Sequence, residues 1–323
     1  MPKSPVAVVT GGAGFIGSHL AERLLAEGYI VRVLDNLSTG RRENLAFAER
    51  APAGRFELIE ADLLDVAALG AALRGADAVL HEAALPSVPR SIADPLESNR
   101  VNINGTLQVL MSARDAGVSR VLYASSSSIY GDAPVLPKVE TLAPAPMSPY
   151  AVGKLAGEHY GRAFHRVYGL GFIGLRYFNV FGPRQDPASE YAAVIPRFIK
   201  AIVDEQTPIV YGDGQQSRDF TYISDVVEAN WLALRAPDAA CGQAYNAAAG
   251  RRVTLLELLQ MLAHLLGRPV APRFEPSRAG DVKHSQADSG QAAAALGWRA
   301  RVSMEDGLQR TVASWPRAAG HAP

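Results

Sequence analysis

The sequence lacks the features of several protein classes. It has one cysteine, Cys241, so no intramolecular disulfide can form, and we expect a reducing compartment such as the cytoplasm. No apolar run approaches the length of a membrane span, and the strand-like run Val6–Val9 starts too early to leave room for a signal peptide. Lys plus Arg number 32 and Asp plus Glu number 32, so no excess charge favours nucleic acid or an anionic membrane as a partner.

What remains is the composition of a packed globular protein. The chain has 323 residues, enough for one large domain or two joined ones, of which 48% are hydrophobic and 20% charged. Residues 316–323 form a short tail that we expect to be disordered. We expect no metal site.

A glycine-rich turn follows the first apolar run. The segment Thr10–Gly17 contains G-x-G-x-x-G at Gly12, Gly14 and Gly17, and Gly11 starts an overlapping G-x-x-G-x-x-G. Helical periodicity follows, so the order strand, glycine turn, helix is the context that the motif requires. Glycine lets the backbone approach a pyrophosphate, which then lies at the positive end of the helix. The segment therefore predicts a dinucleotide site.

The second strand ends in an acidic residue. Val31–Asp35 reads as a strand, and Asp35 lies about twenty residues past the glycines. Its carboxylate can accept hydrogen bonds from both adenine-ribose hydroxyls and would repel a 2′-phosphate, so NAD is favoured over NADP. Arg41 and Arg42 lie nearby and weaken this preference, unless they are solvated loop charges.

Strands and helices then alternate, which predicts a parallel, doubly wound sheet of the Rossmann type. The further expected strands are Phe56–Ala61, Ala78–Ala84, Val121–Ser125 and Phe172–Tyr177. After about Asn179 the regularity breaks. We predict an NAD-binding domain over residues 1–178, to which later segments return, and a smaller mixed α/β lobe over residues 179–315. The cleft between them is the expected substrate pocket.

A potential proton-transfer group lies at the carboxyl edge of this sheet. Tyr150 and Lys154 are four residues apart, so a helix puts both on one face. A phenol is a poor base at neutral pH, but a neighbouring ammonium lowers its pKa. Ser126 follows the fifth strand and could relay a proton between a substrate hydroxyl and the phenolate.

The motifs together resemble the extended short-chain dehydrogenase/reductase family, and within it the UDP-galactose 4-epimerase type. The resemblance extends from Val6 to about Ala313. It is carried by Thr10–Gly17, Asp35–Gly40, Ser125–Gly131, Tyr150-x-x-x-Lys154, Leu175–Gly182, Gly214–Phe220 and Arg278–Asp281.

The resemblance implies an NAD site. Its implied pyrophosphate contacts are Gly11, Gly14, Phe15 and Ile16, and its implied adenosine contacts are Asp35, Asn36, Gly40, Asp62 and Leu63. Ala83 would line the dinucleotide. Tyr150 and Lys154 would bind the nicotinamide ribose, with Tyr177 against the nicotinamide.

The resemblance also implies contacts to a nucleotide sugar. Arg218 and Arg278 match two arginines that grip the diphosphate, for which a guanidinium fork is suited. Asn179 matches a residue that contacts the diphosphate or the sugar, and Tyr211 begins a turn that resembles the family's nucleotide-binding turn. The remaining implied substrate contacts are Ser87, Ser126, Tyr150, Val194 and Ser285.

The implied reaction is a transient oxidation at C4 of the sugar. Tyr150 would take the 4-hydroxyl proton through Ser126, hydride would pass to NAD, and the 4-keto sugar would turn over and be reduced on its other face. Sugar 4,6-dehydratases resembling this fold carry an acidic pair directly after the hydroxyl residue, whereas Ser127 and Ser128 follow here. A non-catalytic NAD-binding protein would be expected to lose these groups. Epimerisation is therefore favoured.

The sugar is suggested by one position. Ser285 matches a gate position that faces the C2 substituent in the family, where serine leaves room for an N-acetyl group. Ser87–Ile92 and Gly131–Glu140 also resemble epimerases that prefer acetylated UDP-hexosamines. We expect UDP-N-acetylglucosamine and UDP-N-acetylgalactosamine to interconvert, and UDP-glucose and UDP-galactose as well. UDP-glucuronate remains an alternative, because a small gate permits the acetyl group without requiring it.

The resemblance finally implies a homodimer joined by a four-helix bundle. The helices concerned are those over residues 94–116 and 148–167. Leu107, Leu110 and Phe164 on these helices belong either to that interface or to the core of the subunit.

Overall fold

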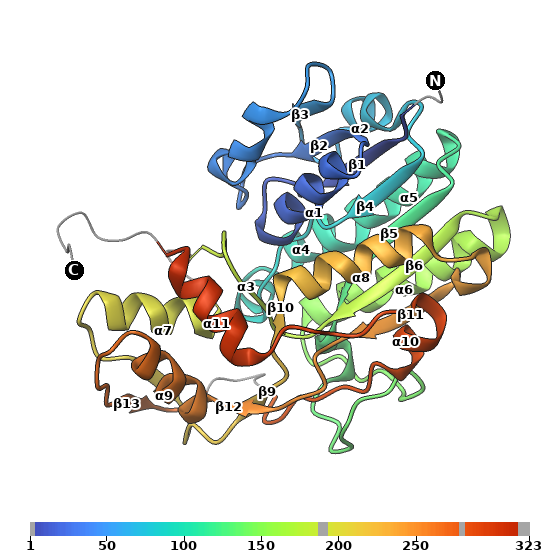
Figure 1. The fold of residues 1–323 in the computed structure, drawn as a ribbon. Coiled ribbons are helices and arrows are strands. Elements are labelled where there is room, and N and C mark those ends of the chain that lie inside the picture. The colour runs from blue at the N-terminus through green and yellow to red at the C-terminus, as the bar shows by residue number, and fades with distance from the viewer. Residues whose placement is uncertain (1–3, 187–192, 278–281, 316–323) are drawn as a thin grey trace.

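The computed structural model describes residues 4–186, 193–277 and 282–315, which form a large sheet with helices on both faces and a smaller lobe (Figure 1). The seven strands of the large sheet are parallel. In spatial order they are β11 (Gln243–Ala247), β6 (Gly171–Tyr177), β5 (Arg120–Ser126), β4 (Ala78–His81), β1 (Val6–Thr10), β2 (Ile30–Asp35) and β3 (Phe56–Glu60). The strand order reverses between β1 and β4, so the expected doubly wound, Rossmann-type sheet is confirmed.

Strand β1 explains why this sheet is covered on both faces. Its five residues are all buried. Val6 and Val8 belong to one apolar cluster, and Ala7 and Val9 to another, because successive side chains point to opposite faces. The first cluster includes residues of α2 (Val66–Leu73), α5 (Thr106–Asp115) and α6 (Pro149–Tyr168), and the second includes residues of α1 (Phe15–Ala26) and α8 (Ile223–Arg235).

Two helical segments lie beside the strands that carry the predicted site. The helix expected over residues 94–116 consists of α4 (Pro95–Asn99), a π-helical segment (Arg100–Gly105) and α5. Helix α6 begins after Ser148, whose hydroxyl accepts the Ala151 N–H at 3.2 Å, and ends at Gly169, which has φ +72°. This N-cap fixes the start of α6 and puts Tyr150 in its first turn.

The smaller lobe consists of short elements. They are β7 (Val180–Phe181), α7 (Val194–Val203), β8 (Ile209–Tyr211), β9 (Ser217–Arg218), β10 (Thr221–Tyr222), β12 (Val253–Thr254), α9 (Leu255–Leu265), β13 (Arg273–Glu275) and α11 (Met304–Ala313). They pair as β7 with β10, β8 with β13 and β9 with β12. Two-residue strands cannot hold a sheet alone, so this lobe depends on its core and its side-chain hydrogen bonds.

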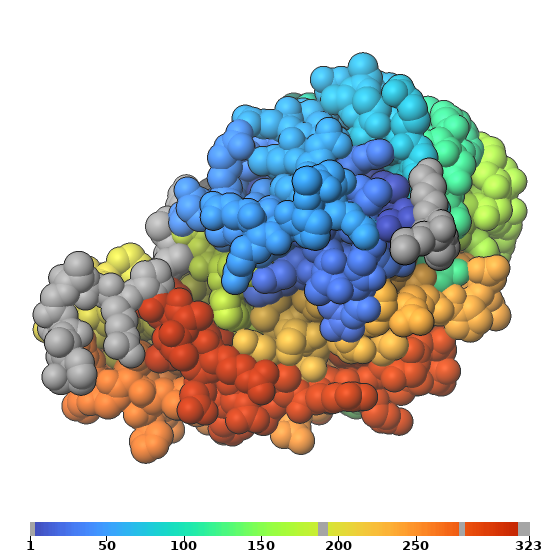
Figure 2. All heavy atoms as spheres, turned by 45° about the horizontal axis from the view of Figure 1, so that its top comes forward, coloured from blue at the N-terminus to red at the C-terminus, as the bar shows by residue number. Residues whose placement is uncertain are grey.

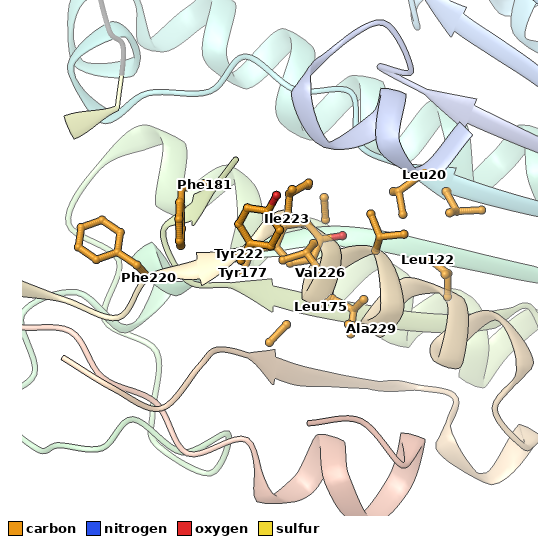
Figure 3. Packing of buried hydrophobic residues seen from close by; sticks show 14 of the residues in the cluster. Leu20, Leu122, Leu175, Tyr177, Phe181, Phe220, Tyr222, Ile223, Val226 and Ala229 are labelled. Carbon is orange, nitrogen blue, oxygen red and sulfur yellow. The ribbon is translucent and has the colours of Figure 1, made fainter. Parts of the chain in front are cut away.

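The smaller lobe and the large sheet share one core. Figure 3 shows Leu122 and Leu175 of the sheet followed by Tyr177 and then by Phe181 and Phe220. The Phe181 and Phe220 rings meet edge to face with centroids 6.2 Å apart. A continuous buried cluster thus joins the lobe to the sheet and fixes its position over the strand ends.

Segments from late in the chain also lie on the large sheet. β11 pairs with β6 at one sheet edge, and α8 packs against α1, β5 and β6. In Figure 2 the orange and red later segments run along one side of the molecule, next to the blue N-terminal part. The remaining helices are α3 (Val88–Ala93), α10 (Gly290–Leu296) and the 3-10 helices Arg42–Arg50, Ser127–Tyr130 and Asp238–Ala240.

Candidate active site

The glycine turn brings three segments into close contact at the carboxyl edge of the sheet. A Cβ on Gly11, which has φ +67°, would lie 2.6 Å from the Ala83 nitrogen after β4. A Cβ on Gly17 would lie 2.3 Å from the Gly11 carbonyl oxygen. Helix α1 then starts at Phe15 with no side-chain hydrogen bond at its N-cap, Gly14, so its first N–H groups can bind an anion. This turn fits a pyrophosphate.

The predicted adenosine residues lie together at the end of β2. The Asp35 carboxylate accepts the N–H groups of Ala13 at 2.9 Å and Leu37 at 2.8 Å. Burial raises the pKa of Asp35, and these two hydrogen bonds oppose the rise. A Cβ on Gly40 would lie 2.9 Å from both carboxylate oxygens, which explains a glycine there. The Asn36 amide donates a 3.1 Å hydrogen bond to the Asp62 carboxylate. Leu63, which follows Asp62 in the sequence, is buried.

The two arginines that weakened the predicted preference for NAD over NADP have acidic partners. Arg41 pairs with Asp186 at 2.7 Å, and Arg42 pairs with Glu60. Both guanidinium groups are therefore engaged with carboxylates of the protein itself, which favours NAD.

Tyr150, Lys154 and Ser126 meet at the ends of β5 and α6. The Lys154 Nζ donates to the Ala124 carbonyl at 2.8 Å and lies 5.9 Å from the centre of the Tyr150 ring. A hydrogen bond joins the Ser126 hydroxyl to the Tyr150 phenol. The same Ser126 oxygen accepts the Ser128 N–H at 3.2 Å. One helical turn and one strand end thus assemble the three groups.

The pKa values correct one expectation from the sequence. Burial raises the pKa of Tyr150 above its usual 10.0, the hydrogen bond from Ser126 lowers it, and the charge of Glu82 raises it. Burial also lowers the pKa of Lys154 to about 8, against the effect of Glu82. The predicted lowering of the Tyr150 pKa by Lys154 is not found for the protein's own residues, because burial outweighs the hydrogen bond from Ser126. A bound cation beside the phenol would have to supply the difference.

A cavity of about 230 Å³ lies in the smaller lobe beside this edge. It is lined by four of the predicted substrate residues, namely Asn179, Val194, Tyr211 and Arg218. The sequence analysis missed other residues of its wall, including Gln185, Arg197, Gln216 and Phe220. Arg197 lies with its guanidinium carbon 5.4 Å from the centre of the Tyr211 ring. Two arginines and an aromatic ring suit a charged, ring-containing ligand.

The predicted gate residue is connected to this cavity through Asn179. The Ser285 hydroxyl accepts hydrogen bonds from the Asn179 amide and the Asp219 N–H, each at 3.3 Å. Ser285 is buried, with 8% of its surface exposed. Asn179 has φ +33°, an unusual conformation for a residue with a side chain, and its amide also donates to the Asp219 carbonyl at 3.1 Å.

Comparison with known proteins identifies the family. Residues 7–248 match the model of the NAD dependent epimerase/dehydratase family. The chain belongs to this family. It is 40% identical to a UDP-glucose 4-epimerase of Mycolicibacterium smegmatis, over 94% of this chain and 96% of that protein.

Solved structures of epimerases agree with this one in fold. A UDP-N-acetylglucosamine 4-epimerase from Methanobrevibacter ruminantium, in complex with UDP-N-acetylmuramic acid, has a TM-score of 0.90 at 39% identity and covers 97% of this chain and 98% of its own. A mutant UDP-glucuronic acid 4-epimerase from Bacillus cereus, in complex with NAD and UDP-4-deoxy-4-fluoro-glucuronic acid, has a TM-score of 0.88 at 32% identity, covering 96% and 98%. The predicted family, enzyme class and NAD cofactor are confirmed.

Two predicted substrate residues lie apart from the cavity wall or outside the described part. Ser87 begins α3, accepts the Arg90 N–H at 3.3 Å and has φ +94°. Strained residues of this kind are frequent at ligand sites of enzymes, so the conformation is consistent with its expected role without testing it. Arg278 lies outside the described residues.

Glu82 is a charged residue beside the catalytic group that the sequence analysis missed. It follows β4 directly, and its carboxylate accepts a 2.8 Å hydrogen bond from the Tyr177 hydroxyl. The Tyr177 oxygen in turn accepts from the Asn230 amide of α8 at 2.8 Å. A polar residue at the carboxyl end of a central parallel strand is the signal that could have found it.

The helices of the expected dimer interface bury some apolar residues and expose others. Leu110 and Phe164 are buried in the subunit, and Leu107 packs against the same cluster, so these three belong to the core. Leu96 on α4 is 83% exposed and Val152 on α6 is 47% exposed, and both line a shallow groove between the two helices. Within the described residues, no helix is long and apolar enough to cross a membrane.

Proposed function

We propose that this enzyme of the epimerase/dehydratase family inverts C4 of a UDP-hexose through a transient 4-keto sugar. The observation that carries the proposal is the group Ser126, Tyr150 and Lys154 at the end of β5. There Ser126 is paired with Tyr177 of β6, and the chain continues from Tyr177 to Asn179 of the cavity wall. A phenol at that point can accept the hydroxyl proton of a sugar whose nucleotide occupies the cavity.

The residues divide the work by position. Tyr150 takes the proton of the 4-hydroxyl, and Ser126, which shares a hydrogen bond with it, orients the sugar oxygen. Lys154, fixed by the Ala124 carbonyl, holds a positive charge near the phenol. NAD, when bound, would supply the reversible hydride transfer at C4. The glycine turn and Asp35 would hold its pyrophosphate and adenosine, and Tyr177 would border its nicotinamide.

Arg218 and Arg197 are well suited to bind the diphosphate of the substrate within the cavity, with Tyr211 and Val194 beside the nucleotide.

Elimination of the C6 hydroxyl, the dehydratase reaction, is a weaker candidate. The residues after Ser126 are Ser127 and Ser128, which form a 3-10 turn and offer no carboxylate to protonate a departing hydroxyl.

Proton NMR with candidate sugars tests this function. The protein is incubated without added NAD with UDP-N-acetylglucosamine, UDP-glucose or UDP-glucuronate, and the galacto-configured product is followed. We expect epimerisation of at least one of them with retained cofactor. A stable 4-keto product would instead establish the dehydratase, and no reaction after addition of NAD would overturn the proposal.

We further propose that the acetylated UDP-hexosamines are the preferred substrates. The support is the small side chain at Ser285, next to Asn179 of the cavity wall. Ser285→Tyr should lower acetylated turnover by about tenfold or more relative to plain hexoses. Because Ser285 is buried, Ser285→Ala is the matched variant: it removes the same hydroxyl without adding bulk, and it should leave the preference unchanged. Equal loss of both sugars in both variants would reject a gate.

We also propose a homodimer joined through α4 and α6, in a reducing compartment such as the cytoplasm. The exposed Leu96 and Val152 and the single Cys241 support these two inferences. Leu96→Glu should halve the mass measured by light scattering. Phe274→Glu, at an apolar side chain that is 53% exposed on β13, is the control and should not change the mass.

A further inference from the structure

The position of Glu82 is fixed by the backbone at the centre of the sheet. Its N–H donates to the Thr10 carbonyl at 3.1 Å, which ties it to the start of the glycine turn. A Cβ on Gly11 would lie 3.0 Å from the carbonyl carbon of Glu82. The residue therefore borders the dinucleotide turn and cannot move away without disturbing β1 and β4.

The side chain of Glu82 is in contact with Tyr177 and influences the catalytic group. Its carboxylate accepts from Tyr177 of β6, whose oxygen is held by Asn230 of α8. The charge of Glu82 raises the pKa of Lys154 and of Tyr150, both of α6. Glu82 thus lies among the three residues expected around the nicotinamide and its ribose.

An ionised carboxylate at this site is not explained by folding. Burial raises the pKa of Glu82 to about 7, while the Tyr177 hydrogen bond and the Lys154 charge lower it. A neutral amide would accept the Tyr177 hydroxyl equally well without that desolvation cost. The carboxylate must therefore be considered for what its charge does.

We propose that the Glu82 carboxylate, in its ionised form, is a negative charge beside the nicotinamide site that makes the enzyme favour oxidised over reduced cofactor. This inference rests on the proposed function for the position of the nicotinamide near Tyr177. An oxidised nicotinamide is positively charged and loses that charge when it gains a hydride, so a neighbouring anion stabilises only the oxidised form. Such a charge drives the hydride back to the 4-keto sugar before the sugar can leave.

A competition experiment tests the charge directly. The purified protein is equilibrated with mixtures of NAD and NADH at set ratios, freed of unbound cofactor by rapid gel filtration, and its bound NADH is measured by fluorescence. At about pH 8 we expect Glu82→Gln to raise the bound ratio of NADH to NAD roughly tenfold, the size of an interaction worth one pKa unit. At about pH 6, where Glu82 is more protonated, the difference between the two proteins should be smaller.

The other titratable groups near Glu82 are controlled for by comparing the wild-type protein with Glu82→Gln. Lys154 and Tyr150 face Glu82 from α6 and Tyr177 from β6, and they remain in both proteins. Because Glu82 raises the pKa of Lys154, Glu82→Gln also changes the charge of Lys154 near pH 8. The comparison is therefore repeated in a Lys154→Met background, where the difference between the two pH profiles reports Glu82 without the lysine. Glu60→Gln removes an equal charge at the exposed end of β3, on the adenosine side, and should not change the ratio.

The outcomes distinguish this inference from the proposed function. If Glu82→Gln binds both cofactors with an unchanged ratio at each pH, Glu82 only anchors Tyr177 and the inference is wrong. If the wild-type protein binds neither cofactor, the proposed function itself is wrong. If the ratio rises at the higher pH and the Glu60→Gln control does not move, the charge has the proposed role.

Discussion

The carboxyl edge of the large sheet, here called the cofactor edge, and the smaller lobe with its cavity are held in their conformations by different kinds of contact. At the cofactor edge, the four residues 11–14 between β1 and α1 make the turn, and a fully parallel sheet fixes its neighbours. In the lobe, the cavity wall comes from segments between Asn179 and Leu255, and the paired strands are two or three residues long. The first region is held by backbone regularity and the second by a few side chains.

The side chain that organises the lobe is Asp219. Its buried carboxylate accepts the N–H groups of Gly250 at 3.1 Å and Ala287 at 3.0 Å, while its backbone is bonded to Asn179 and Ser285. One carboxylate thus joins segments that a sheet would otherwise join. Substitutions in the loops of the lobe can therefore alter which ligand it binds, whereas substitutions at the cofactor edge would disturb the sheet.

The largest effect is expected where the two regions meet. Tyr150→Phe removes the proton-accepting oxygen and should lower epimerase turnover by about 10²–10⁴-fold, while NAD stays bound. Turnover is followed by NMR and bound NAD by its absorbance after denaturation. Tyr160→Phe on the same helix, at a ring that is 38% exposed, is the control and should keep full activity. Comparable turnover in the two variants would remove Tyr150 from the mechanism.

The next prediction tests the rigidity of the cofactor edge. Gly17→Ala forces a Cβ against the Gly11 carbonyl and should lower the free energy of unfolding by about 1–3 kcal/mol, with loss of bound NAD. Gly70→Ala is the matched control, because Gly70 lies in a helix with nothing within 4 Å of the added Cβ. It should raise the free energy of unfolding by about 0.5–1 kcal/mol. Urea unfolding measures both, and a stable, NAD-loaded Gly17→Ala protein would contradict this account.

The third prediction tests the lobe. Asp219→Asn leaves one of the N–H donors without an acceptor and should lower the free energy of unfolding by about 1–3 kcal/mol. UDP-sugar affinity, measured by calorimetry, should fall, whereas NAD affinity should not, because the cofactor edge does not depend on Asp219. Asp204→Asn, at an exposed residue of the same lobe, is the control. Parallel loss of both ligands would show that the two regions are not independent.

The smallest effect concerns pH. Burial raises the pKa of Glu82 and of Asp219 to about 7 in the folded protein, from 4.5 and 3.8. Between these pKa values the folded state therefore binds more protons than the unfolded state. The contribution of each group to the free energy of unfolding is complete below its unfolded pKa and is lost as the pH rises toward 7. We expect a loss on the order of 1 kcal/mol per group for each pH unit between these values. Urea unfolding from about pH 5 to about pH 8 should show a flatter profile for Glu82→Gln with Asp219→Asn.

The two regions also differ in what the sequence reveals. The glycine turn, Asp35 and the Tyr150–Lys154 pair are defined by spacing within one or two adjacent elements, so their arrangement follows from periodicity. Glu82 and Asp219 owe their roles to partners far away in the chain. The position of Glu82 directly after a central strand is a signal for a site but does not reveal its partners, and nothing local marks Asp219 as the residue that joins the lobe. The strand β11, Gln-Ala-Tyr-Asn-Ala, is short and contains two amides, so its place beside β6 was equally unreadable.

The pairing of β11 with β6 has a consequence for synthesis of the chain. Until residues 243–247 leave the ribosome, β6 is an edge strand whose backbone groups on one side have no partner. Its residues are almost all buried in the finished sheet, so a nascent chain stalled after β6 presents an apolar, unpaired edge. The large sheet is therefore complete only when residue 247 of 323 has been released, and until then the buried strand β6 stands at its edge.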